Sequence, residues 1–423
     1  MQEIIFKKNI LILGAGFGGI KCALELERLF KKYPKLKEKY NIVLMDKNDA
    51  HLYTPALYEV ATAFKEDAEA MDLKKSVCVP VEEILADKNI KFIQGKIDKI
   101  DLPFKKILLN DGSEWPFEYL VLSLGSETNY FNIEGLKEHS VGLKSFEDAL
   151  AVRNKIAEYY KEHCYLNIVV GGGGAAGVEV AGEIIGYLRK LENKYKGRRI
   201  EVFLAEAAPA GVLPGFDEEI TKKTKERLEK LGVKIICGSP LVKVDSSAAY
   251  FADGKKIEYG VLIWTGGVKP NRLLDDLCLV KERRGKVELE PTMCCLSASE
   301  DLALKEKIYA IGDLTCFYDP KTKIPLPGTA RVAMSEAKVV ARNIFADLAH
   351  QPKIKYIPAK SFPFVIPIGG KFAVAQVGPF KIFGFPAWIL KMLVEFHYFH
   401  SILPFGAAFK KWVKSVWIYI KND

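Results

Sequence analysis

Two glycine-rich segments contain the residues of this chain whose types and spacing most directly imply chemistry. Each follows an apolar run and has the spacing G-x-G-x-x-G. The glycines are Gly14, Gly16 and Gly19 in the first segment and Gly172, Gly174 and Gly177 in the second. Glycine permits a tight turn and lets the backbone approach a pyrophosphate, which the N-terminus of the following helix then faces. One such motif is weak evidence, but two in the same context predict two dinucleotide sites.

An acidic residue follows each glycine motif at a similar distance. Asp46 lies 27 residues beyond Gly19, and Glu206 lies 29 residues beyond Gly177. The usual separation is about 20 residues, and a charged stretch before each acid explains the excess. A carboxylate here can accept hydrogen bonds from ribose hydroxyls and repels a 2′-phosphate. With no arginine nearby, Glu206 predicts NADH rather than NADPH; the alternative is a surface acid at a strand end.

The elements that must position these residues repeat as well. In both copies an apolar strand leads into the glycine turn, a helix follows, and a second strand ends at the acid. Short strands follow each copy, and we interpret each set as an antiparallel meander. The sets cover 90–100, 105–112 and 118–125 in the first copy and 233–244, 248–260 and 261–267 in the second. A later apolar strand ends at Gly312-Asp313, before a helix expected over 329–349. The pattern predicts an α/β fold with two Rossmann-like domains.

The composition excludes several other classes of protein. The 423 residues are 49% hydrophobic and 27% charged, which is unlike disordered chains, collagen or small disulfide scaffolds. The longest run without a charged residue is 164–178, 15 residues with five glycines, whereas a spanning helix needs about 20 apolar residues. Six of the eight cysteines stand far apart and none forms a CxxC pair, which indicates a reducing compartment; the six histidines show no metal-binding spacing. We therefore expect no metal site.

Two dinucleotide sites in one chain imply two different dinucleotides. The economical interpretation is a flavin in one site and a pyridine nucleotide in the other, with hydride passing from nicotinamide to flavin. This step needs no protein acid or base, and no catalytic triad or carboxylate pair stands out in the sequence. The expected domains are an FAD-binding domain in two parts, 1–130 and 286–350, an NADH-binding domain at 131–285, and a C-terminal region at 351–423.

Several longer segments resemble one flavoprotein family. They are LGAGFGG at 13–19, HLYTPALYEVAT at 51–62, LVLSLGSETNYF at 120–131, GGGGAAGVEVAGE at 171–183, LAEAAPAGVLPGFD at 204–217, YAIGD at 309–313 and a tryptophan-containing tail. The chain resembles, over essentially its whole length, the type II NADH dehydrogenases. These are single-chain, FAD-containing NADH:quinone oxidoreductases of the two-dinucleotide-binding-domain flavoprotein superfamily.

The resemblance implies roles for individual residues. It implies non-covalent FAD at Gly14, Gly16, Gly19, Asp46, Lys47, Gly125, Gly312, Asp313 and Ala330. It implies NADH, as substrate, at Gly172, Gly174, Gly177, Glu206 and Gly266. It also places Glu179 near the nicotinamide, as a catalytic residue; the alternative role for Glu179 is an acid that stabilises the first turn of its helix.

The C-terminal tail has two amphipathic segments. From Phe409 to Ile420, apolar residues recur with helical spacing and lysines lie off the stripe; in 387–403, Lys391, Glu395 and Tyr398 share one face. Lysine with tryptophan on an amphipathic helix suits a headgroup boundary. We expect C-terminal membrane-associating helices, an anionic lipid surface as partner and a peripheral position on the cytoplasmic face of the membrane, in a homodimer. The alternative is a core or dimer-interface helix.

One departure from the family concerns the electron acceptor. Where the family has glutamines after the YAIGD loop, this chain reads TARVAMSEA: Arg331 and Ser335 replace two glutamines, and Glu336 follows. Arg331 carries a fixed charge and cannot accept a hydrogen bond. It could stabilise an anionic flavin or quinol as a second catalytic residue, or it could block the pose of a membrane quinone.

Three other functions remain open at this point. The first is a sulfide:quinone oxidoreductase, for which Cys316 is the candidate cysteine, although no partner cysteine is evident. The second is an NADH oxidoreductase with a soluble acceptor, and the third is a non-catalytic, redox-sensing flavoprotein. Nucleic acid is not expected as a partner, because the lysines behind the net charge of +9 are spread along the chain.

Overall fold

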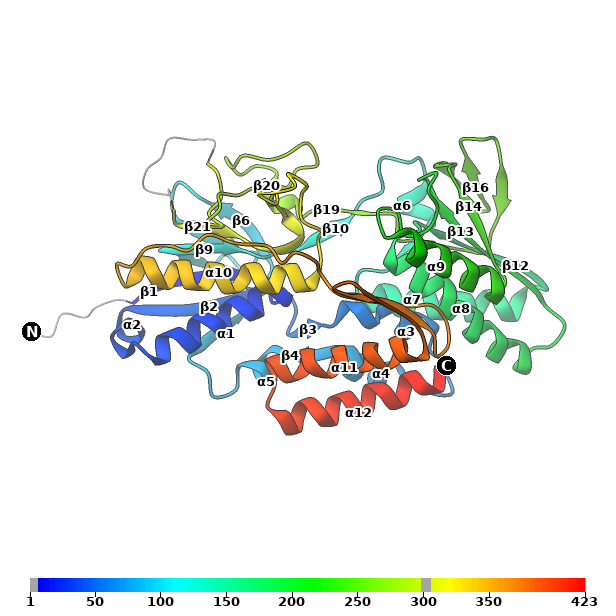
Figure 1. The fold of residues 1–423 in the computed structure, drawn as a ribbon, viewed down its shortest axis with the longest axis horizontal. Helices are drawn as coiled ribbons and strands as arrows, with labels where there is room; N and C mark the ends of the chain where they lie inside the picture. Colours follow the sequence, from blue (N-terminus) through cyan, green and yellow to red (C-terminus); the bar gives the residue numbers. More distant parts are fainter. Residues whose placement is uncertain (1–6, 298–305, 423) are drawn as a thin grey trace, which may run out of the picture. The chain divides into compact units, whose positions relative to one another are not determined.

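The computed structural model describes residues 7–297 and 306–422. They form two compact units that each use several stretches of the chain (Figure 1). Unit 1 comprises the described residues of Met1–His51, Val79–Glu127 and Val268–Phe362. Unit 2 comprises those of Leu52–Cys78, Thr128–Gly267 and Pro363–Asp423. The tail therefore groups with the second glycine motif.

Unit 1 is built on a five-stranded parallel sheet. Its strand order is β21 (Ile308–Ala310), β9 (Tyr119–Leu122), β1 (Lys8–Leu13), β2 (Tyr40–Asp46) and β5 (Ile90–Gln94). Helices α1 (Phe17–Lys31) and α10 (Ala330–Leu348) pack side by side (Figure 1). Ile10 and Ile12 point to one face of the sheet and Leu11 and Leu13 to the other, and all four are fully buried. The sheet is therefore covered on both faces.

Unit 2 repeats this architecture. Its parallel sheet has the order β11 (Val141–Gly142), β18 (Val261–Trp264), β12 (Tyr165–Gly171), β13 (Arg199–Glu206) and β14 (Val233–Cys237). Three helices accompany these strands in the chain, namely α7 (Phe146–Glu162), α8 (Ala175–Lys194) and α9 (Glu218–Leu231). A capping box between Ser145 and Asp148 begins α7, and Gly232 in the left-handed region (φ 96°) ends α9. The prediction of an α/β fold with two Rossmann-like domains is confirmed.

The two meanders are shorter than the sequence pattern predicted. The meander of the first copy consists of β6 (Ile97–Asp101), β7 (Lys106–Leu109) and β8 (Glu114–Pro116), and that of the second copy consists of β15 (Leu241–Val244), β16 (Ala248–Phe251) and β17 (Lys256–Glu258). The flanking strands β5 and β9, and likewise β14 and β18, belong to the parallel sheets. The interpretation of each set as one meander was wrong because β9 and β18, buried at every residue, are central parallel strands.

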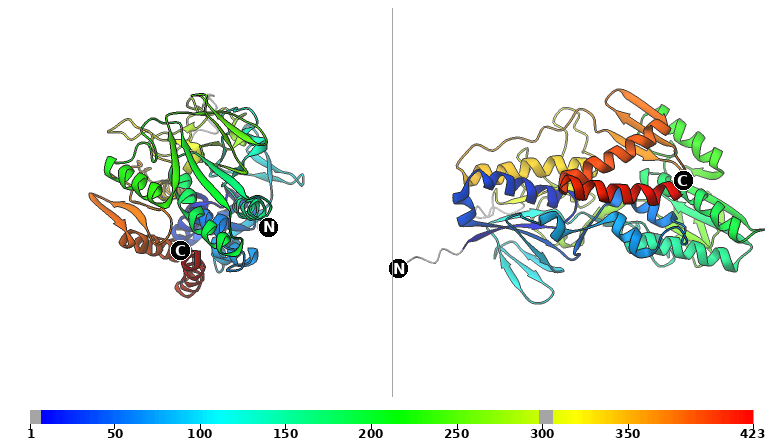
Figure 2. Two further views of the ribbon diagram at one scale, coloured as in Figure 1. Left: turned by 90° about the vertical axis from the view of Figure 1, so that its right-hand side faces the viewer. Right: turned by 90° about the horizontal axis from the view of Figure 1, so that it is seen from below.

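The C-terminal part of unit 2 is a three-stranded antiparallel sheet followed by two helices. The strands are β23 (Phe364–Pro367), β24 (Ala373–Val377) and β25 (Phe380–Gly384), and the helices are α11 (Phe385–Ile402) and α12 (Phe405–Asn422). The two helices pack against one another (Figure 2). In the described part of the chain, no helix combines the length and the apolar character needed to cross a bilayer.

Shorter elements complete the described chain. They are α2 (Pro34–Lys39), β3 (Ala50–Leu52), η1 (Thr54–Ala56), α3 (Leu57–Thr62), α4 (Ala70–Val77), β4 (Cys78–Pro80), α5 (Val81–Leu85), β10 (Ser126–Thr128), α6 (Leu136–His139), β19 (Val268–Pro270), η2 (Arg272–Leu274), β20 (Val287–Glu288), η3 (Gly312–Leu314) and β22 (Thr315–Cys316). Helix α2 lies in the charged stretch before Asp46, which accounts for the long spacing in the first copy.

Candidate dinucleotide sites

The residues predicted to hold a flavin lie at the carboxyl ends of the strands of unit 1. Gly14 follows β1, Asp46 ends β2, Gly125 follows β9, and Gly312 follows β21. Because these strands are parallel, their carboxyl ends share one edge of the sheet. Ligands of open α/β sheets bind at this edge. The structure thus brings together residues that are up to 298 positions apart in the sequence.

The first glycine turn combines tight packing with one open position. Gly14 has φ 104°, and a β-carbon on Gly19 would lie 1.9 Å from the Gly14 carbonyl oxygen, so neither position accepts a side chain. At Gly16, by contrast, nothing lies within 4 Å of an added β-carbon. Gly16 begins α1 without a side-chain cap. Protein atoms therefore leave room beside Gly16 at the N-terminus of α1, which is the end of a helix that attracts an anion.

Asp46 ties the first turn to the neighbouring strand. Its Oδ2 accepts a hydrogen bond from the Ala15 backbone N–H at 2.7 Å, and its Oδ1 accepts one from the Asn48 N–H at 2.8 Å. These bonds fix the carboxylate beside the turn. Lys47 is exposed next to it. A carboxylate with two oxygens retains lone pairs for ribose hydroxyls after these bonds.

The second turn has the same design in unit 2. Gly172 has φ 105°, and a β-carbon on Gly177 would lie 1.8 Å from the Gly172 carbonyl oxygen, whereas Gly174 has nothing within 4 Å. The Glu206 Oε2 accepts a hydrogen bond from the Gly173 N–H at 2.6 Å, and Oε1 accepts one from the Ala208 N–H at 2.8 Å. Glu206 is therefore anchored to the turn rather than free at the surface.

Gly266 lies at the same edge of the second sheet. It follows β18, whose neighbour β12 leads into the glycine turn. A β-carbon on Gly266 would lie 2.4 Å from the Trp264 ring, and one on Gly172 would lie 2.5 Å from the Gly266 Cα. This close packing leaves Gly172, Glu206 and Gly266 at one edge of the sheet.

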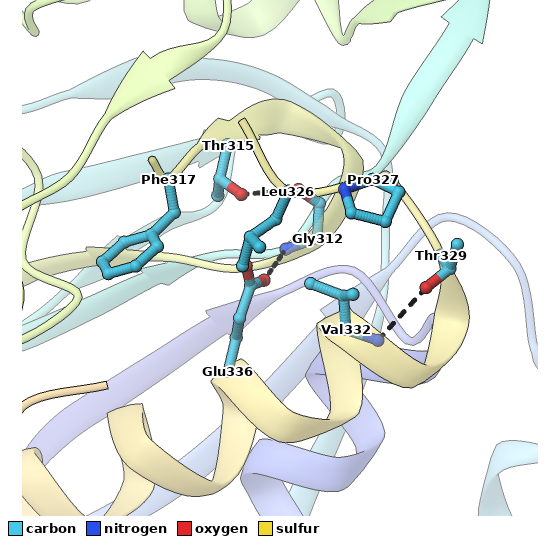
Figure 3. A pocket seen from close by; sticks show the side chains of 9 residues that line it. Gly312, Thr315, Phe317, Leu326, Pro327, Thr329, Val332 and Glu336 are labelled. Carbon is cyan, nitrogen blue, oxygen red and sulfur yellow. Dashed lines mark hydrogen bonds between the residues drawn. The ribbon is translucent and has the colours of Figure 1, made fainter. Parts of the chain in front are cut away.

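The segment after β21 carries the remaining candidate flavin residues. Gly312 has φ 85°, and the Asp313 Oδ2 accepts a hydrogen bond from the Ser126 hydroxyl at 2.6 Å. Gly312 and Thr329 belong to the wall of a hollow of about 220 Å³, which includes open solvent at its mouth (Figure 3). The Thr329 hydroxyl accepts a hydrogen bond from the Val332 N–H at 3.3 Å, so Thr329 caps the N-terminus of α10. The helix predicted after this loop is confirmed.

The start of α10 carries the residues that depart from the family. Ala330 is the first residue of α10, and Arg331 is exposed beside it. Within the described chain, Arg331 makes no ion pair that would neutralise its charge. Ser335 is within hydrogen-bonding distance of the Tyr356 hydroxyl, at 2.7 Å. Glu336 is 1% exposed and accepts a hydrogen bond from the Gly312 N–H at 2.7 Å (Figure 3).

Glu179 lies in the first turns of α8, as the sequence suggested, but its surroundings were not predicted. Burial of the carboxyl raises its pKa to about 8, with Lys391 acting to lower the pKa and Glu59 to raise it. Lys391 on α11 and Glu59 on α3 form a buried ion pair at 2.6 Å. The chain thus places a compensated charge pair within electrostatic reach of Glu179.

The polar face of α11 points into unit 2. Lys391, Glu395 and Tyr398 are buried, and neither carboxylate oxygen of Glu395 finds a hydrogen-bond partner among the described residues. Sequence analysis noted this face but did not predict its burial. A lysine and a glutamate four residues apart in an otherwise apolar helix were the available signal, because buried charges require partners.

The opposite faces of α11 and α12 expose apolar side chains. These side chains are Phe385, Ile389, Leu393 and Val394 on α11, and Phe405, Phe409, Val413, Trp417 and Ile420 on α12. Trp412 and Val416, which the sequence placed on the same stripe, instead pack partly buried against the core around Trp388. Both helices therefore carry apolar side chains on their exposed side as well as on their buried side, unlike the usual helix of a globular protein.

Among the described residues, the cysteines form no disulfide, and no cluster of cysteine, histidine or acidic side chains forms a metal site. All eight cysteines are free, and Cys316 is buried, which raises the pKa of its thiol. Over residues 7–297 and 306–422, no group of three or more His, Cys, Asp or Glu side chains is placed to hold a metal ion.

Comparisons with known proteins agree with this geometry. The family model described as pyridine nucleotide-disulphide oxidoreductase matches residues 8–337. A type II NADH:quinone oxidoreductase of Staphylococcus aureus is 28% identical over 422 residues, which cover 96% of this chain and 98% of that protein.

Two solved structures share the fold. NDH2 from Plasmodium falciparum, determined in complex with NADH, has a TM-score of 0.82 at 18% identity and covers 97% of this chain and 98% of its own. The sulfide:quinone oxidoreductase of Aquifex aeolicus has a TM-score of 0.73 at 19% identity and covers 93% of this chain and 91% of its own. At these identities the likeness concerns the fold alone.

Proposed function

Because the chain belongs to the pyridine nucleotide-disulphide oxidoreductase family, we propose that it is a type II NADH dehydrogenase that transfers electrons from NADH, through non-covalent FAD, to a membrane quinone. The observation that carries this proposal is the duplicated turn. In both units an acid accepts a hydrogen bond from the turn, and one glycine faces open space. The relative named as a type II NADH:quinone oxidoreductase covers 96% of the chain, which extends the similarity beyond the turns.

The residues of unit 1 fit an FAD. Gly14, Gly16 and Gly19 would receive the pyrophosphate at the N-terminus of α1, and Asp46 would accept the ribose hydroxyls. Lys47, Gly125, Asp313, Gly312 and Ala330 would line the rest of the site. The chemistry that a bound flavin supplies is acceptance of a hydride and delivery of two electrons. Every cysteine is free, and none lies in a recognisable flavin-attachment motif, which supports non-covalent binding.

Unit 2 would bind the nicotinamide nucleotide. Gly172, Gly174 and Gly177 would receive its pyrophosphate, and Glu206 would accept the ribose hydroxyls. Gly266 would lie at the same sheet edge. We assign Glu179 to the neighbourhood of the nicotinamide; desolvation raises the pKa of its carboxyl to about 8.

Two features bear on the acceptor. Arg331 is exposed at the start of α10, where it could donate charge-assisted hydrogen bonds to an anionic quinol oxygen. The exposed apolar faces of α11 and α12 fit a lipid surface that dissolves a quinone. We propose a peripheral protein at the anionic, cytoplasmic face of the membrane that acts as a homodimer.

Sulfide oxidation is the weaker candidate. That chemistry needs reactive cysteines beside the flavin, whereas burial raises the pKa of the one candidate, Cys316, and so lowers its thiolate fraction. The anchored Glu206 favours a pyridine nucleotide in unit 2.

The proposal is tested by mixing the purified, flavin-loaded protein anaerobically with NADH, NADPH or sulfide and following the yellow absorbance. NADH should bleach the flavin fastest, and a short-chain quinone should restore the colour. Bleaching by sulfide alone, or none with NADH, contradicts the proposal.

Three glycine variants test which turn binds the flavin and which binds NADH. Gly174→Val should retain the flavin, but NADH should no longer bleach it. The valine side chain displaces no protein atom and instead fills the open space in which the nucleotide would bind. Gly16→Val should lose the flavin for the same reason. Gly406→Ala, at an equally open position in α12, is the control and should leave both properties unchanged.

A further inference from the structure

Glu336 is a buried acid that the proposed reaction does not yet use. It lies on α10 at the wall of the hollow of about 220 Å³, and its Oε2 accepts the hydrogen bond from the Gly312 N–H (Figure 3). Gly312 precedes Asp313, which is held by Ser126 in the segment assigned to the flavin. Glutamine would accept the same hydrogen bond, but only a carboxyl can also exchange a proton.

The charges that face Glu336 leave its carboxyl close to titration. Burial raises its pKa to about 8; Asp313 also acts to raise the pKa, whereas the Gly312 N–H and Lys286 act to lower it. On the remaining side lies Tyr356, whose own pKa is raised to about 12, so that its hydroxyl is uncharged. Glu336 is therefore protonated at neutral pH and ionises within about one pH unit above it.

A hydride transfer would change the charge of a flavin bound, as proposed, beside Gly312. The hydride of NADH brings two electrons and one proton, so the cofactor that accepts it gains one negative charge. A negative charge nearby favours the protonated form of a carboxyl. Glu336 lines the hollow together with Gly312 and Thr329, and we take this hollow as the path of the exchanged proton.

We propose that Glu336 is a redox-linked proton acceptor for the flavin, a role that rests on the proposed function. When its carboxyl is ionised, it binds one proton from solvent as the hydride reaches the cofactor. It releases that proton to solvent when the reduced cofactor passes two electrons and one proton to the quinone and so loses the added negative charge; the second proton of the quinol comes from solvent. Glu336 is thus a positioning residue for Gly312 and a charge-compensating residue for the cofactor segment.

The test is the pH dependence of the flavin midpoint potential, measured by spectroelectrochemical titration of the full-length holoprotein between pH 6 and 10. Glu336→Gln keeps an oxygen for the Gly312 N–H but cannot titrate. The wild-type potential should fall more steeply than the Glu336→Gln potential from about pH 8 upward. Each tenfold difference in proton affinity between the two redox states corresponds to about 30 mV for a two-electron couple.

The control variant is Glu25→Gln. Glu25 is also a buried acid of unit 1, on α1, but it is paired with Arg28 and its pKa is lowered. The flavin midpoint potential of Glu25→Gln should fall with pH at the same slope as that of the wild type. Parallel slopes for the wild type and Glu336→Gln would overturn the inference.

A second measurement needs no variant. Stoichiometric NADH added to weakly buffered wild-type protein with an indicator dye should cause proton uptake that is near zero at pH 6.5 and rises above pH 8. A stoichiometry that does not rise overturns the inference. If NADH fails to bleach the flavin at all, the proposed function fails; if bleaching occurs without this rise, the inference alone fails.

Discussion

Glu395 offers the sharpest test of the buried charge cluster in unit 2. Its side chain is 0% exposed, and neither carboxylate oxygen finds a hydrogen-bond partner among the described residues. Burial raises the pKa of Glu395 to about 7; Lys391 and Lys411 act to lower it and Glu59 to raise it. We predict that Glu395→Gln stabilises the protein at alkaline pH.

The sign and size follow from proton linkage. The folded state holds the proton of Glu395 up to a pKa of about 7, whereas the unfolded chain loses it near 4.5. Folding stability therefore falls as the pH rises between these values. A shift of about 2.5 units corresponds to about 3 kcal/mol. Glutamine cannot ionise, so the advantage of Glu395→Gln over the wild type should grow from pH 4.5 to pH 7 and reach up to about 3 kcal/mol.

The assay is urea unfolding at pH 5 and pH 8, followed by tryptophan fluorescence, since Trp388 and Trp412 lie in the core of the tail. The difference between the urea midpoints of the variant and the wild type should be larger at pH 8. Glu226→Gln, an exposed acid on α9, serves as control and should show no such dependence. Equal differences at both pH values would refute the reasoning, because they would mean that folding does not raise the pKa of Glu395.

Three further predictions concern the proposed activity. Glu206→Arg should reduce the preference for NADH over NADPH on the order of tenfold, because a charge-assisted ribose hydrogen bond is worth about 1.5–3 kcal/mol; an unchanged ratio of bleaching rates contradicts this. Arg331→Gln should alter flavin reoxidation by a short-chain quinone more than flavin reduction by NADH, measured by stopped flow; equal effects would remove Arg331 from the acceptor site. The double variant Phe405→Ser with Trp417→Ser should bind anionic liposomes less in a sedimentation assay, whereas Phe104→Ser, which is 76% exposed in unit 1, should not; equal losses would contradict a specific role for the tail.

The glycine turns could be predicted in detail because their geometry is local. A strand, three glycines at fixed spacing and a helix define the turn within about ten residues. The acids Asp46 and Glu206 were predicted as ribose acceptors, and the structure places them beside the turns. Their bonds to the Ala15 and Gly173 N–H groups were not foreseen, since these depend on the register of adjacent strands.

The strand assignments failed where burial on both faces removed the alternating pattern. Tyr119–Leu122 and Val261–Trp264 are continuous apolar runs of four residues, which fit a meander or a central parallel strand equally well. Only the pairing across the sheet distinguishes them. The same error occurred in both copies, because in each copy the last strand of the set is buried on both faces and so lacks the alternation of apolar and polar residues.

The charge cluster of unit 2 could not be predicted because its members come from distant segments. Glu59 and Lys391 are 332 positions apart, and each looks unremarkable in its own helix. The sequence did show Lys391 and Glu395 on one face of an apolar helix. Without knowledge of α3, that face could equally have pointed to solvent, with the apolar face inside.

Arg331 and Glu336 act separately because of their positions on α10. Arg331 and Glu336 are five residues apart, which at 3.6 residues per turn places them about 140° apart around the helix axis. Arg331 is accordingly exposed, and Glu336 is buried against Gly312. The cation therefore cannot neutralise the carboxylate that forms above about pH 8. We expect Glu336→Gln to change the pH dependence of the flavin potential and Arg331→Gln to change the rate of quinone reduction. The double variant should show each change at the size seen in the single variant.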